Sequence, residues 1–475
     1  MLFNSVAFLV FIVVFLPIFF NLNNSWKNKF LLLSSYFFYS FWDWRFLLLI
    51  IVSTCVDYFI GLKLECTENK PNRKLLLLCS VVTNLAILGF FKYCNFFIDS
   101  FSELLQIIGI NGSWNTLNII LPVGISFYTF QSMSYTLDVY NRKCLVEKNF
   151  FLFATYIALF PQLVAGPIVR ASHLLPQMKL NHSYDYFRMV KGIEIIIWGY
   201  FLKLCVADRL DFLVTPVYSN PDAYGGAAHL IATFSFSFQI YADFFGYSLI
   251  AIGLGKIMGY DFGINFKRPY LATNFSDFWE RWHISLSSWL RDYLYIPLGG
   301  NRNGTVKTLR NLLVVMFLGG LWHGAAWTYV IWGVIHGIYL VLQNLISNLN
   351  LKLTKAPIAS VFYYKLFKIT LVFNMISFSW IFFRAESLDS ALLIISRIFE
   401  FNDYFHGASY DLFALVIGVC MITIVISVDV ICEFTNIKKY YFNNVVARSV
   451  CSIMLLWLIV FLGVFEGTTF IYFQF

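Results

Sequence analysis

Long apolar runs are the feature that most constrains what this chain can fold into. A transmembrane helix needs about 20 predominantly apolar residues. Charged residues make up only 13% of the 475 positions, against about 25% in a typical soluble domain. We therefore predict an all-α polytopic membrane protein with about 10–12 membrane-embedded helices, forming one integral membrane domain over residues 1–475. The apolar runs lie near residues 5–22, 30–62 (broken around Asp43 and Arg45), 75–98, 117–140, 150–169, 192–214, 229–255, 311–346, 361–383, 411–431 and 449–465.

Basic residues sort unevenly among the loops and so predict an orientation in the cell membrane, because Lys and Arg favour the cytoplasmic side. Basic loops lie near 63–74, 142–148, 256–310, 352–368 and 438–448. The segments 98–119 and 215–230 contain no Lys or Arg, and 386–411 is acidic, so we expect these three outside. Counting crossings from them places both termini outside the cell. Topology thus accounts for the net charge of +8, and we expect a lipid bilayer and no nucleic acid as partner.

Two segments do not fit a simple count of crossings. If the run at 150–169 crossed the membrane, the basic stretch that follows it would lie outside the cell, where Lys and Arg are disfavoured. We therefore expect this run to be short or re-entrant. The run at 311–346 has basic residues at both ends and must cross an even number of times, yet it is short for two crossings. A broken or tilted helical hairpin fits better, with its middle at membrane depth. Irregular backbone there predicts a cavity.

The middle of this hairpin carries a histidine, which makes it the first candidate for chemistry. His323 lies in the run GGLWHGAAW at 319–327. An ionisable residue within a membrane is costly and is a functional hypothesis by default. The alternative is a neutral histidine hydrogen-bonded between helices. Glycines on both sides permit close backbone approach, and Trp322 and Trp327 are placed to line a slot for a substrate chain.

A second histidine lies in a stretch with a helical apolar stripe. Asn274 is a candidate N-cap, and the helix should stop before Pro297. The periodicity predicts an amphipathic helix in the cytoplasmic interface, with a Trp-rich face that includes Trp282 turned inward. His283 falls at the edge of that stripe. This position suits either an interfacial hydrogen bond or a group that projects into a cavity.

The remaining motifs exclude several classes of chemistry. His336 lies thirteen residues after His323, about 220° around a continuous helix, so we expect it to pack elsewhere. The sequence has no His-x-x-x-His pair and no carboxylate or cysteine cluster typical of a metal site. It also lacks a phosphate-binding Gly-Lys-Ser/Thr loop and a Gly-x-Ser-x-Gly elbow. ATP hydrolysis and serine-esterase chemistry therefore have no support, and we predict no metal.

Several long motifs resemble those of the bacterial membrane-bound O-acyltransferases. They are FWERWHISLSSWLRDYLYIPLGGNR at 278–302, GGLWHGAAW at 319–327, FPQLVAGPIVR at 160–170 and FIYFQF at 470–475. Together they are similar to the alginate O-acetyltransferase branch over nearly the whole chain. The segment 297–302 favours this branch over the related D-alanyl transferase to teichoic acid, which remains the alternative within the family.

The resemblance implies a fold, a reaction and roles for the two histidines. Helices would surround a central funnel, with the signature motifs in a core at about 121–346 and peripheral helices at 1–98 and 361–475. His323 would be the catalytic histidine and His283 the second signature histidine. An acyl group would pass from a cytoplasmic thioester to a hydroxyl acceptor.

The resemblance also implies the substrates. The donor would be acetyl-CoA or another acyl thioester, with no tightly bound cofactor. The acceptor would be a cell-surface polysaccharide or an extracytoplasmic acetyltransferase partner. Phe245 and Leu249 stand where this branch leads us to expect Ser and Asp, which leaves the acceptor open.

These roles lead to a hypothesis for the mechanism. Neutral His323, with its pKa kept near or below neutrality by poor solvation, would take the proton of the acceptor hydroxyl as the oxygen attacks the thioester carbonyl. His283 would orient the donor or stabilise the oxyanion. We take five further residues as candidates for binding substrate or donor: Trp282, Arg291, Trp322, Trp327 and Asp243. A positive field from Arg281, Arg291, Arg302, Lys307 and Arg310 would suit CoA phosphates, although topology explains these residues almost as well.

Two other function classes remain as alternatives. A transporter would use charged residues within or near the spans as an ion path, but paired interrupted helices in inverted repeats are not evident. A scaffold for exopolysaccharide export would have no chemistry of its own. The charged residues of the transporter alternative are Asp57, Lys92, Asp138, Glu194, Lys203 and Asp243.

Overall fold

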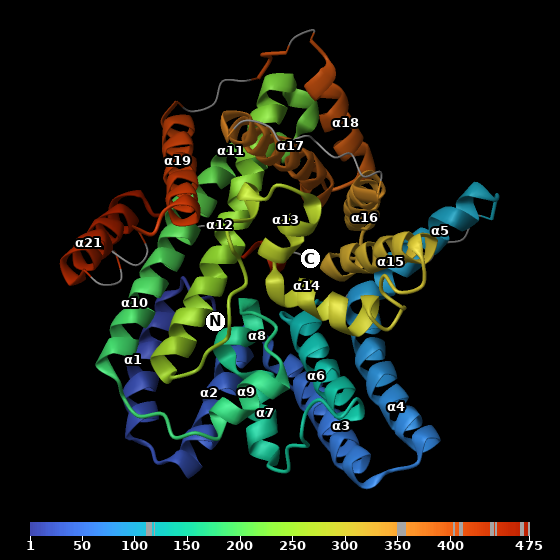
Figure 1. The fold of residues 1–475 in the computed structure, drawn as a ribbon, viewed down its shortest axis with the longest axis vertical. Coiled ribbons are helices and arrows are strands. Elements are labelled where there is room, and N and C mark those ends of the chain that lie inside the picture. The colour runs from blue at the N-terminus through green and yellow to red at the C-terminus, as the bar shows by residue number, and fades with distance from the viewer. Residues whose placement is uncertain are drawn as a thin grey trace. The chain divides into compact units, whose positions relative to one another are not determined.

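The computed structural model of this chain describes residues 1–110, 116–117, 119–348, 358–401, 404–407, 412–437, 441, 444–465 and 470–473. The described residues form helices and no strands, which confirms the all-α fold class (Figure 1). Seven helical stretches are long and apolar enough to cross a membrane, and two shorter helical stretches are also apolar. The seven stretches are Ser25–Cys66, Lys70–Ile107, Gly226–Met258, Trp327–Ser347, Phe362–Arg384, Leu412–Phe434 and Val445–Leu462.

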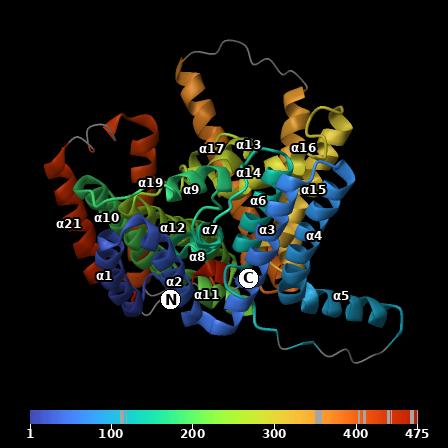
Figure 2. The same ribbon diagram turned by 90° about the horizontal axis from the view of Figure 1, so that it is seen from below.

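The chain divides into two compact units, of which the first comprises Met1–Ile193 and Ile250–Gly263. Its helices α3, α4 and α6 pack on one another and lie side by side in Figure 2. The helices of this unit are α1 (Val6–Asn21), α2 (Asn24–Asp43), α3 (Leu47–Cys66), α4 (Lys70–Leu88), α5 (Cys94–Ile107), α6 (Ile125–Tyr140), α7 (Phe150–Ala158), α8 (Phe160–Ala165) and α9 (Ala171–Met178).

Two expectations about the first unit are confirmed. The break expected near Asp43 and Arg45 is the end of α2, where the Asp43 carboxylate accepts a hydrogen bond from the Arg45 backbone N–H. The run at 150–169 is short: α7 has 9 residues and α8 has 6, so neither reaches the length of about 20 residues that a crossing needs.

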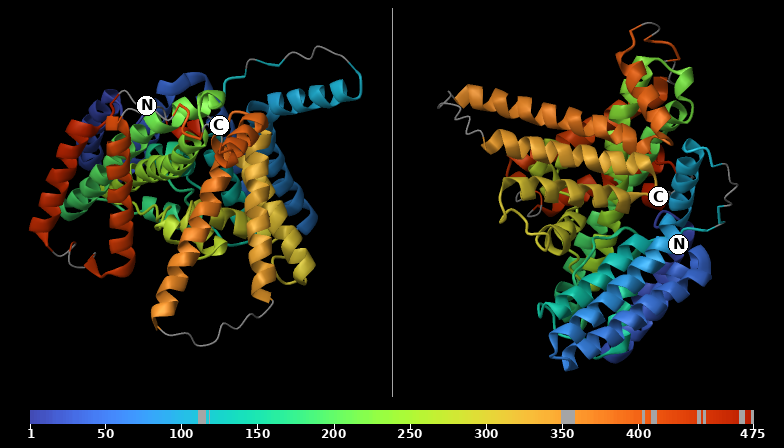
Figure 3. Two further views of the ribbon diagram at one scale, coloured as in Figure 1. Left: turned by 90° about the horizontal axis from the view of Figure 1, so that it is seen from above. Right: turned by 90° about the vertical axis from the view of Figure 1, so that its right-hand side faces the viewer.

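The second unit, Glu194–Leu249 and Ile264–Phe475, holds both candidate histidines. α15, α16 and α17 pack in sequence and run side by side in Figure 3. The helices are α10 (Tyr186–Tyr200), η3 (Phe201–Ala207), α11 (Asp208–Ser219), α12 (Gly226–Met258), α13 (Phe275–Arg281), α14 (Ile284–Leu290), η6 (Arg291–Tyr295), α15 (Thr305–His323), α16 (Trp327–Asn348), α17 (Ile358–Arg384), α18 (Leu388–Phe399), α19 (Leu412–Phe434), α21 (Val445–Leu462) and η7 (Ile471–Phe473). The unit boundary runs through α10 and α12.

The expected broken hairpin is α15 and α16, separated at residues 324–326. The break is confirmed, and the hairpin is longer than its apolar run; of its two arms, α16 but not α15 is among the stretches long and apolar enough to cross a membrane. Helix α15 begins at Thr305, six residues before the apolar run, so the arms have 19 and 22 residues. At 1.5 Å per residue each arm is about 30 Å long. His323 is therefore the last residue of a full-length arm.

The expectation of one continuous amphipathic helix around His283 is also wrong. The Asn274 cap is confirmed, because its side chain accepts a hydrogen bond from the Asp277 backbone N–H. The helix is interrupted at His283, whose backbone has a φ of +43°, and it continues as α14 and η6. Figure 1 shows α13 and α14 beside the hairpin of α15 and α16.

Candidate functional site

His323 lies in an aromatic surrounding at the end of α15. The helix ends because Gly324 takes an extended conformation with φ of −157°. The histidine is 3% exposed. Its ring centroid lies 5.0 Å from those of Trp322 and Trp332 and 5.5 Å from that of Phe383. The aromatic rings shield this imidazole from water.

His283 is buried completely and is held by a polar network. Asn265 Oδ1 accepts hydrogen bonds from the Ser285 backbone N–H at 3.2 Å and the Ser285 hydroxyl at 2.9 Å. The His283 Nδ1 atom lies 3.2 Å from the same oxygen. Because an oxygen already accepting from a backbone N–H can only accept, the network assigns the proton of the neutral imidazole to Nδ1. Nε2 then carries a lone pair and acts as an acceptor.

Burial keeps His283 in its neutral form. Desolvation of the charged imidazole lowers the pKa of His283 from its ordinary value of 6.5 to about 3. Of the two placements left open for His283, the interfacial one is wrong, because the residue is fully buried and Phe244 packs edge-on against its ring with centroids 4.7 Å apart. A continuous helix would have left the side chain at the edge, whereas the left-handed conformation turns it inward.

The two histidines lie together in the second unit. Their ring centroids are 6.4 Å apart, and the Trp322 ring contacts both imidazoles. The Tyr472 ring also contacts both, with centroids 5.6 Å from His323 and 6.5 Å from His283. The sequence reasoning missed Tyr472 as a site residue. Its signal was the terminal aromatic run at 470–475, which served only as part of the family resemblance.

The remaining candidates are distributed around this pair. Trp282 is fully buried in a second aromatic cluster, with centroids 5.7 Å from Phe278 and 5.1 Å from Trp380. Trp327 is 48% exposed at the first residue of α16. Asp243 is buried, and its carboxylate accepts a hydrogen bond from the Ile471 backbone N–H at 2.7 Å. Asp243 therefore contacts the segment that carries Tyr472.

The basic residues suggested for a CoA site differ in their pairing. Arg281 forms ion pairs with Asp277 at 2.6 Å and Glu433 at 3.1 Å, so its charge is neutralised within the protein. Arg291 is exposed and pairs with its neighbour Asp292 at 2.8 Å. Arg302 and Lys307 are exposed. Arg281 therefore does not contribute to the positive field expected for binding CoA phosphates.

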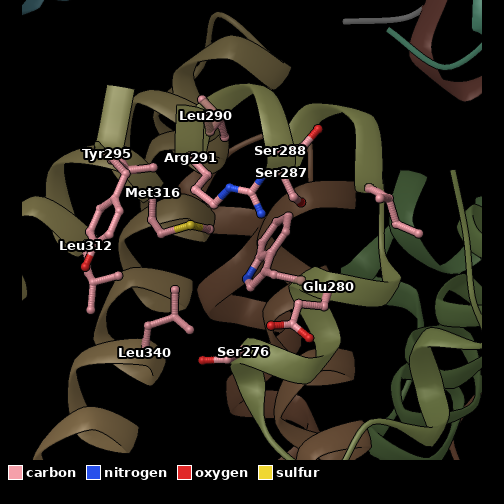
Figure 4. Close-up of a pocket in the computed structure, with 13 residues that line it drawn as sticks. Ser276, Glu280, Ser287, Ser288, Leu290, Arg291, Tyr295, Leu312, Met316 and Leu340 are labelled. Carbon is pink, nitrogen blue, oxygen red and sulfur yellow. The ribbon is translucent and has the colours of Figure 1, made fainter. Parts of the chain in front are cut away.

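A pocket of about 360 Å³ opens beside Arg291 in the same unit. In Figure 4 the Arg291 guanidinium points across the pocket toward Ser287. Met316 lies in its wall, seven residues before His323 on α15, or about 10 Å along the helix axis. The lining residues are Ser276, Trp279, Glu280, Ile284, Ser287, Ser288, Leu290, Arg291, Tyr295, Leu312, Val315, Met316 and Leu340.

The depressed pKa of His283 predicts a specific loss of stability in acid. Below its ordinary pKa of 6.5 the unfolded chain binds a proton at His283, whereas the folded chain does not until about pH 3. Stability from this residue is therefore fully present above 6.5 and falls as the pH falls. Relative to His283→Asn, the wild type should lose about 1.4 kcal/mol per pH unit between about pH 6 and pH 4.

Denaturant unfolding of both proteins in detergent at several pH values measures this difference. Asn is the suitable replacement because it tolerates positive φ. Parallel stability curves for the two proteins would show that His283 takes up a proton equally in the folded and unfolded states.

Comparison with known proteins agrees with the motifs. Residues 145–383 match the MBOAT, membrane-bound O-acyltransferase family. The chain is 40% identical over 407 residues to the probable alginate O-acetylase AlgI of Pseudomonas syringae pv. tomato, covering 85% of this chain and 76% of that protein. It is 35% identical over 431 residues to the peptidoglycan O-acetyltransferase of Helicobacter pylori, covering 83% and 79%. It is 29% identical over 274 residues to the teichoic acid D-alanyltransferase of Streptococcus thermophilus, covering 52% and 64%.

The family match spans the break at His283 and the hairpin whose first arm ends at His323. The resemblance drawn from the motifs is thereby confirmed. The chain belongs to the membrane-bound O-acyltransferase family and is a multi-pass membrane O-acyltransferase.

Proposed function

We propose that this protein moves an acetyl group from a thioester on the cytoplasmic side to a hydroxyl acceptor for O-acetylation of a cell-surface polysaccharide. The observation that carries the proposal is the pair of buried imidazoles with centroids 6.4 Å apart. Relatives named for alginate and for peptidoglycan O-acetylation support a polysaccharide acceptor, reached directly or through an extracytoplasmic partner protein. The arrangement of basic loops supports an orientation with both termini outside the cell.

In this proposal His323 is the general base. Its imidazole takes the proton of the acceptor hydroxyl while the oxygen forms a bond to the acyl carbon. The carbon–sulfur bond of the thioester then breaks, and the leaving thiolate takes the proton back from the imidazolium. General-base action of this kind contributes about 10²–10⁴-fold to a rate. The positioning of donor and acceptor supplies much of the rest.

His283 acts in this proposal by orienting a substrate. A neutral imidazole with its proton on Nδ1 has no hydrogen to donate from Nε2, so that nitrogen cannot stabilise an oxyanion by donating a hydrogen bond. Its lone pair can accept a hydrogen bond from an acceptor hydroxyl or from an amide of the donor. Of the two roles suggested by the sequence, the network around Asn265 supports orientation.

The pocket beside Arg291 is the proposed donor site. Its wall is mostly apolar, which suits the acyl arm of a thioester donor, and its two charged residues are Arg291 and Glu280. It lies in the basic stretch 256–310 expected on the cytoplasmic side. Leu290 lines the pocket and lies against Gly319, four residues before His323 on α15.

Filling this pocket should weaken donor binding. Leu340 lines the pocket on α16, so Leu340→Trp places a larger ring where the donor arm would lie. We expect the KM for acetyl-CoA to rise about tenfold with kcat nearly unchanged. The variant weakens donor binding equally in the ground state and the transition state, and it leaves the histidines in place. Leu342→Trp is the matched control, since Leu342 is 47% exposed and does not line the pocket. Equal KM values for both variants would place the donor elsewhere.

The proposed function is tested by following a labelled acetyl group. Purified protein is reconstituted in liposomes and supplied with acetyl-CoA labelled on the acetyl carbon, together with an alginate or peptidoglycan acceptor. Label on the glycan or on a partner protein supports the proposal. Uptake of label without transfer would instead support the transporter alternative. A protein that neither transfers nor takes up label would fit a scaffold.

A further inference from the structure

The segment that carries Tyr472 is fixed to one face of α12. The Ile471 backbone N–H donates a hydrogen bond to Asp243 Oδ2 at 2.7 Å. The Phe470 ring stacks on the Tyr247 ring with centroids 4.5 Å apart and is completely buried. Asp243 and Tyr247 are four residues apart, so they lie on the same helix face. One backbone contact and one ring contact thus hold Phe470 and Ile471 against α12.

Asp243 is itself held by buried charges. Lys203 Nζ lies 2.8 Å from Asp243 Oδ1 and 2.8 Å from Asp208 Oδ1, and all three side chains are 1% exposed. Removing one partner of a buried ion pair leaves an uncompensated charge, which is strongly unfavourable. This arrangement therefore fixes the Asp243 carboxylate, with one oxygen on Lys203 and the other on the Ile471 backbone.

The triad is possible because two helices approach closely at glycines. A Cβ atom on Gly246 of α12 would lie 2.8 Å from the Gly199 carbonyl oxygen and 3.1 Å from the Lys203 backbone nitrogen. Small residues permit such close helix crossings in membranes. Lys203 belongs to η3, a π-helical stretch, and π-bulges occur frequently at functional sites. In η3 the Leu204 carbonyl also accepts a hydrogen bond from the Val464 backbone N–H at 3.0 Å.

We propose that the Lys203–Asp243 ion pair forms a buried latch that positions Tyr472 against His323 and His283, with Asp243 as the positioning residue. The latch acts through the backbone of Ile471. Tyr472 packs on Phe244, with centroids 4.3 Å apart, and its ring contacts both imidazoles. A ring in this place keeps water from the reacting groups. Asp243 therefore serves the site from a distance, and the functional part of this inference rests on the proposed function.

Hydrogen exchange measures the latch independently of activity. Exchange of the peptide that contains Ile471 is followed by mass spectrometry on the full-length protein in detergent. We expect Asp243→Ala to speed exchange at this peptide about tenfold or more, because the amide loses its acceptor. Asp208→Asn is the matched control: it removes the other carboxylate of the triad, keeps the acceptor of Ile471, and should leave exchange within about twofold of wild type. Wild-type exchange in Asp243→Ala would overturn the latch.

The kinetic signature separates positioning from donor binding. We expect Asp243→Ala to lower kcat about 100-fold, the scale of a misplacement of about 1 Å. The KM for acetyl-CoA should stay within about twofold, because Asp243 does not line the donor pocket. Asp243→Asn keeps a carbonyl acceptor and should recover part of both the exchange protection and kcat. Unchanged kcat in Asp243→Ala with rapid exchange would overturn the positioning role.

A second variant guards against misfolding of the triad mutants. Phe470→Ala removes the ring that stacks on Tyr247 while the three charges stay intact. It should give the same pair of changes, faster exchange near Ile471 and lower kcat with unchanged KM. Phe470→Ala with wild-type kcat would count against the positioning role. If the wild type transferred no labelled acetyl group while Asp243→Ala still changed the exchange, the proposed function would fail and the structural latch would stand.

Discussion

Replacing His323 with alanine is expected to lower kcat for acetyl transfer about 10²–10⁴-fold, the range typical of a lost general base. The donor KM should change little, because the pocket beside Arg291 does not include this residue. The cavity left at a 3% exposed side chain also costs some stability, so the comparison is made on protein shown to be folded by its elution volume and unfolding midpoint. Transfer of labelled acetyl groups in liposomes measures the effect.

His336→Gln is the matched control for this experiment. His336 is also fully buried, and its ring lies 4.7 Å from the same Trp332 ring that His323 contacts at 5.0 Å. Its Nε2 atom lies 3.0 Å from the Ser379 hydroxyl, and Gln retains groups that can bond there. We expect activity within a few-fold of wild type. Equal losses in the two variants would mean that the whole aromatic cluster, rather than the His323 base, limits the reaction.

The location of His323 could be read from the sequence because basic residues at both ends of the 311–346 run require a break near its middle. The structure ends α15 at His323, with Gly324 extended. His336 was expected to face away from His323 on a continuous helix, but the helix is broken between them and both rings contact Trp332. The length of α15 was misjudged because its first turn, from Thr305, is polar and lies outside the apolar run.

The position of His283 could not be read from the sequence. Its apolar stripe has a helical period that continues through residue 283, so the pattern gives no sign of a break. The break depends on Asn265, eighteen residues away, whose side chain bonds both His283 and Ser285. A left-handed histidine is held by surrounding structure rather than by its own preference. Only the tertiary fold shows that this side chain faces the interior.

The partnership between Asp243 and the terminal segment is also a tertiary property. Asp243 and Ile471 are 228 residues apart in sequence, and no local periodicity joins them. The sequence offered Asp243 as a binding residue because it is a charge in a long apolar helix. In the structure the Asp243 carboxylate pairs with Lys203 and accepts a hydrogen bond from the Ile471 backbone N–H. Trp282 likewise fills a buried aromatic cluster, as large aromatic side chains commonly do.

The second large effect is expected at the hairpin that carries His323. Gly320 and Gly333 let α15 and α16 approach each other, and a Cβ atom on Gly320 would lie 2.3 Å from the Tyr329 carbonyl oxygen and 3.0 Å from the Gly333 Cα atom. These neighbours are backbone atoms of the facing helix and cannot rotate away. Gly320→Ala must therefore separate the two arms near His323. Overpacking of this kind costs about 1–3 kcal/mol.

The displacement should also reduce activity. His323 is one helical turn beyond Gly320, so a shift of about 1 Å in α15 carries the imidazole with it and can lower kcat about 100-fold. Gly319→Ala is the control, because its Cβ would meet only Leu290 Cδ1 at 3.4 Å, an ordinary contact. In a helix interior, alanine is about 1 kcal/mol more favourable than glycine, so this neighbour should be neutral or more stable. If both variants kept wild-type unfolding midpoints and kcat, the close approach of the two arms would not be what places His323.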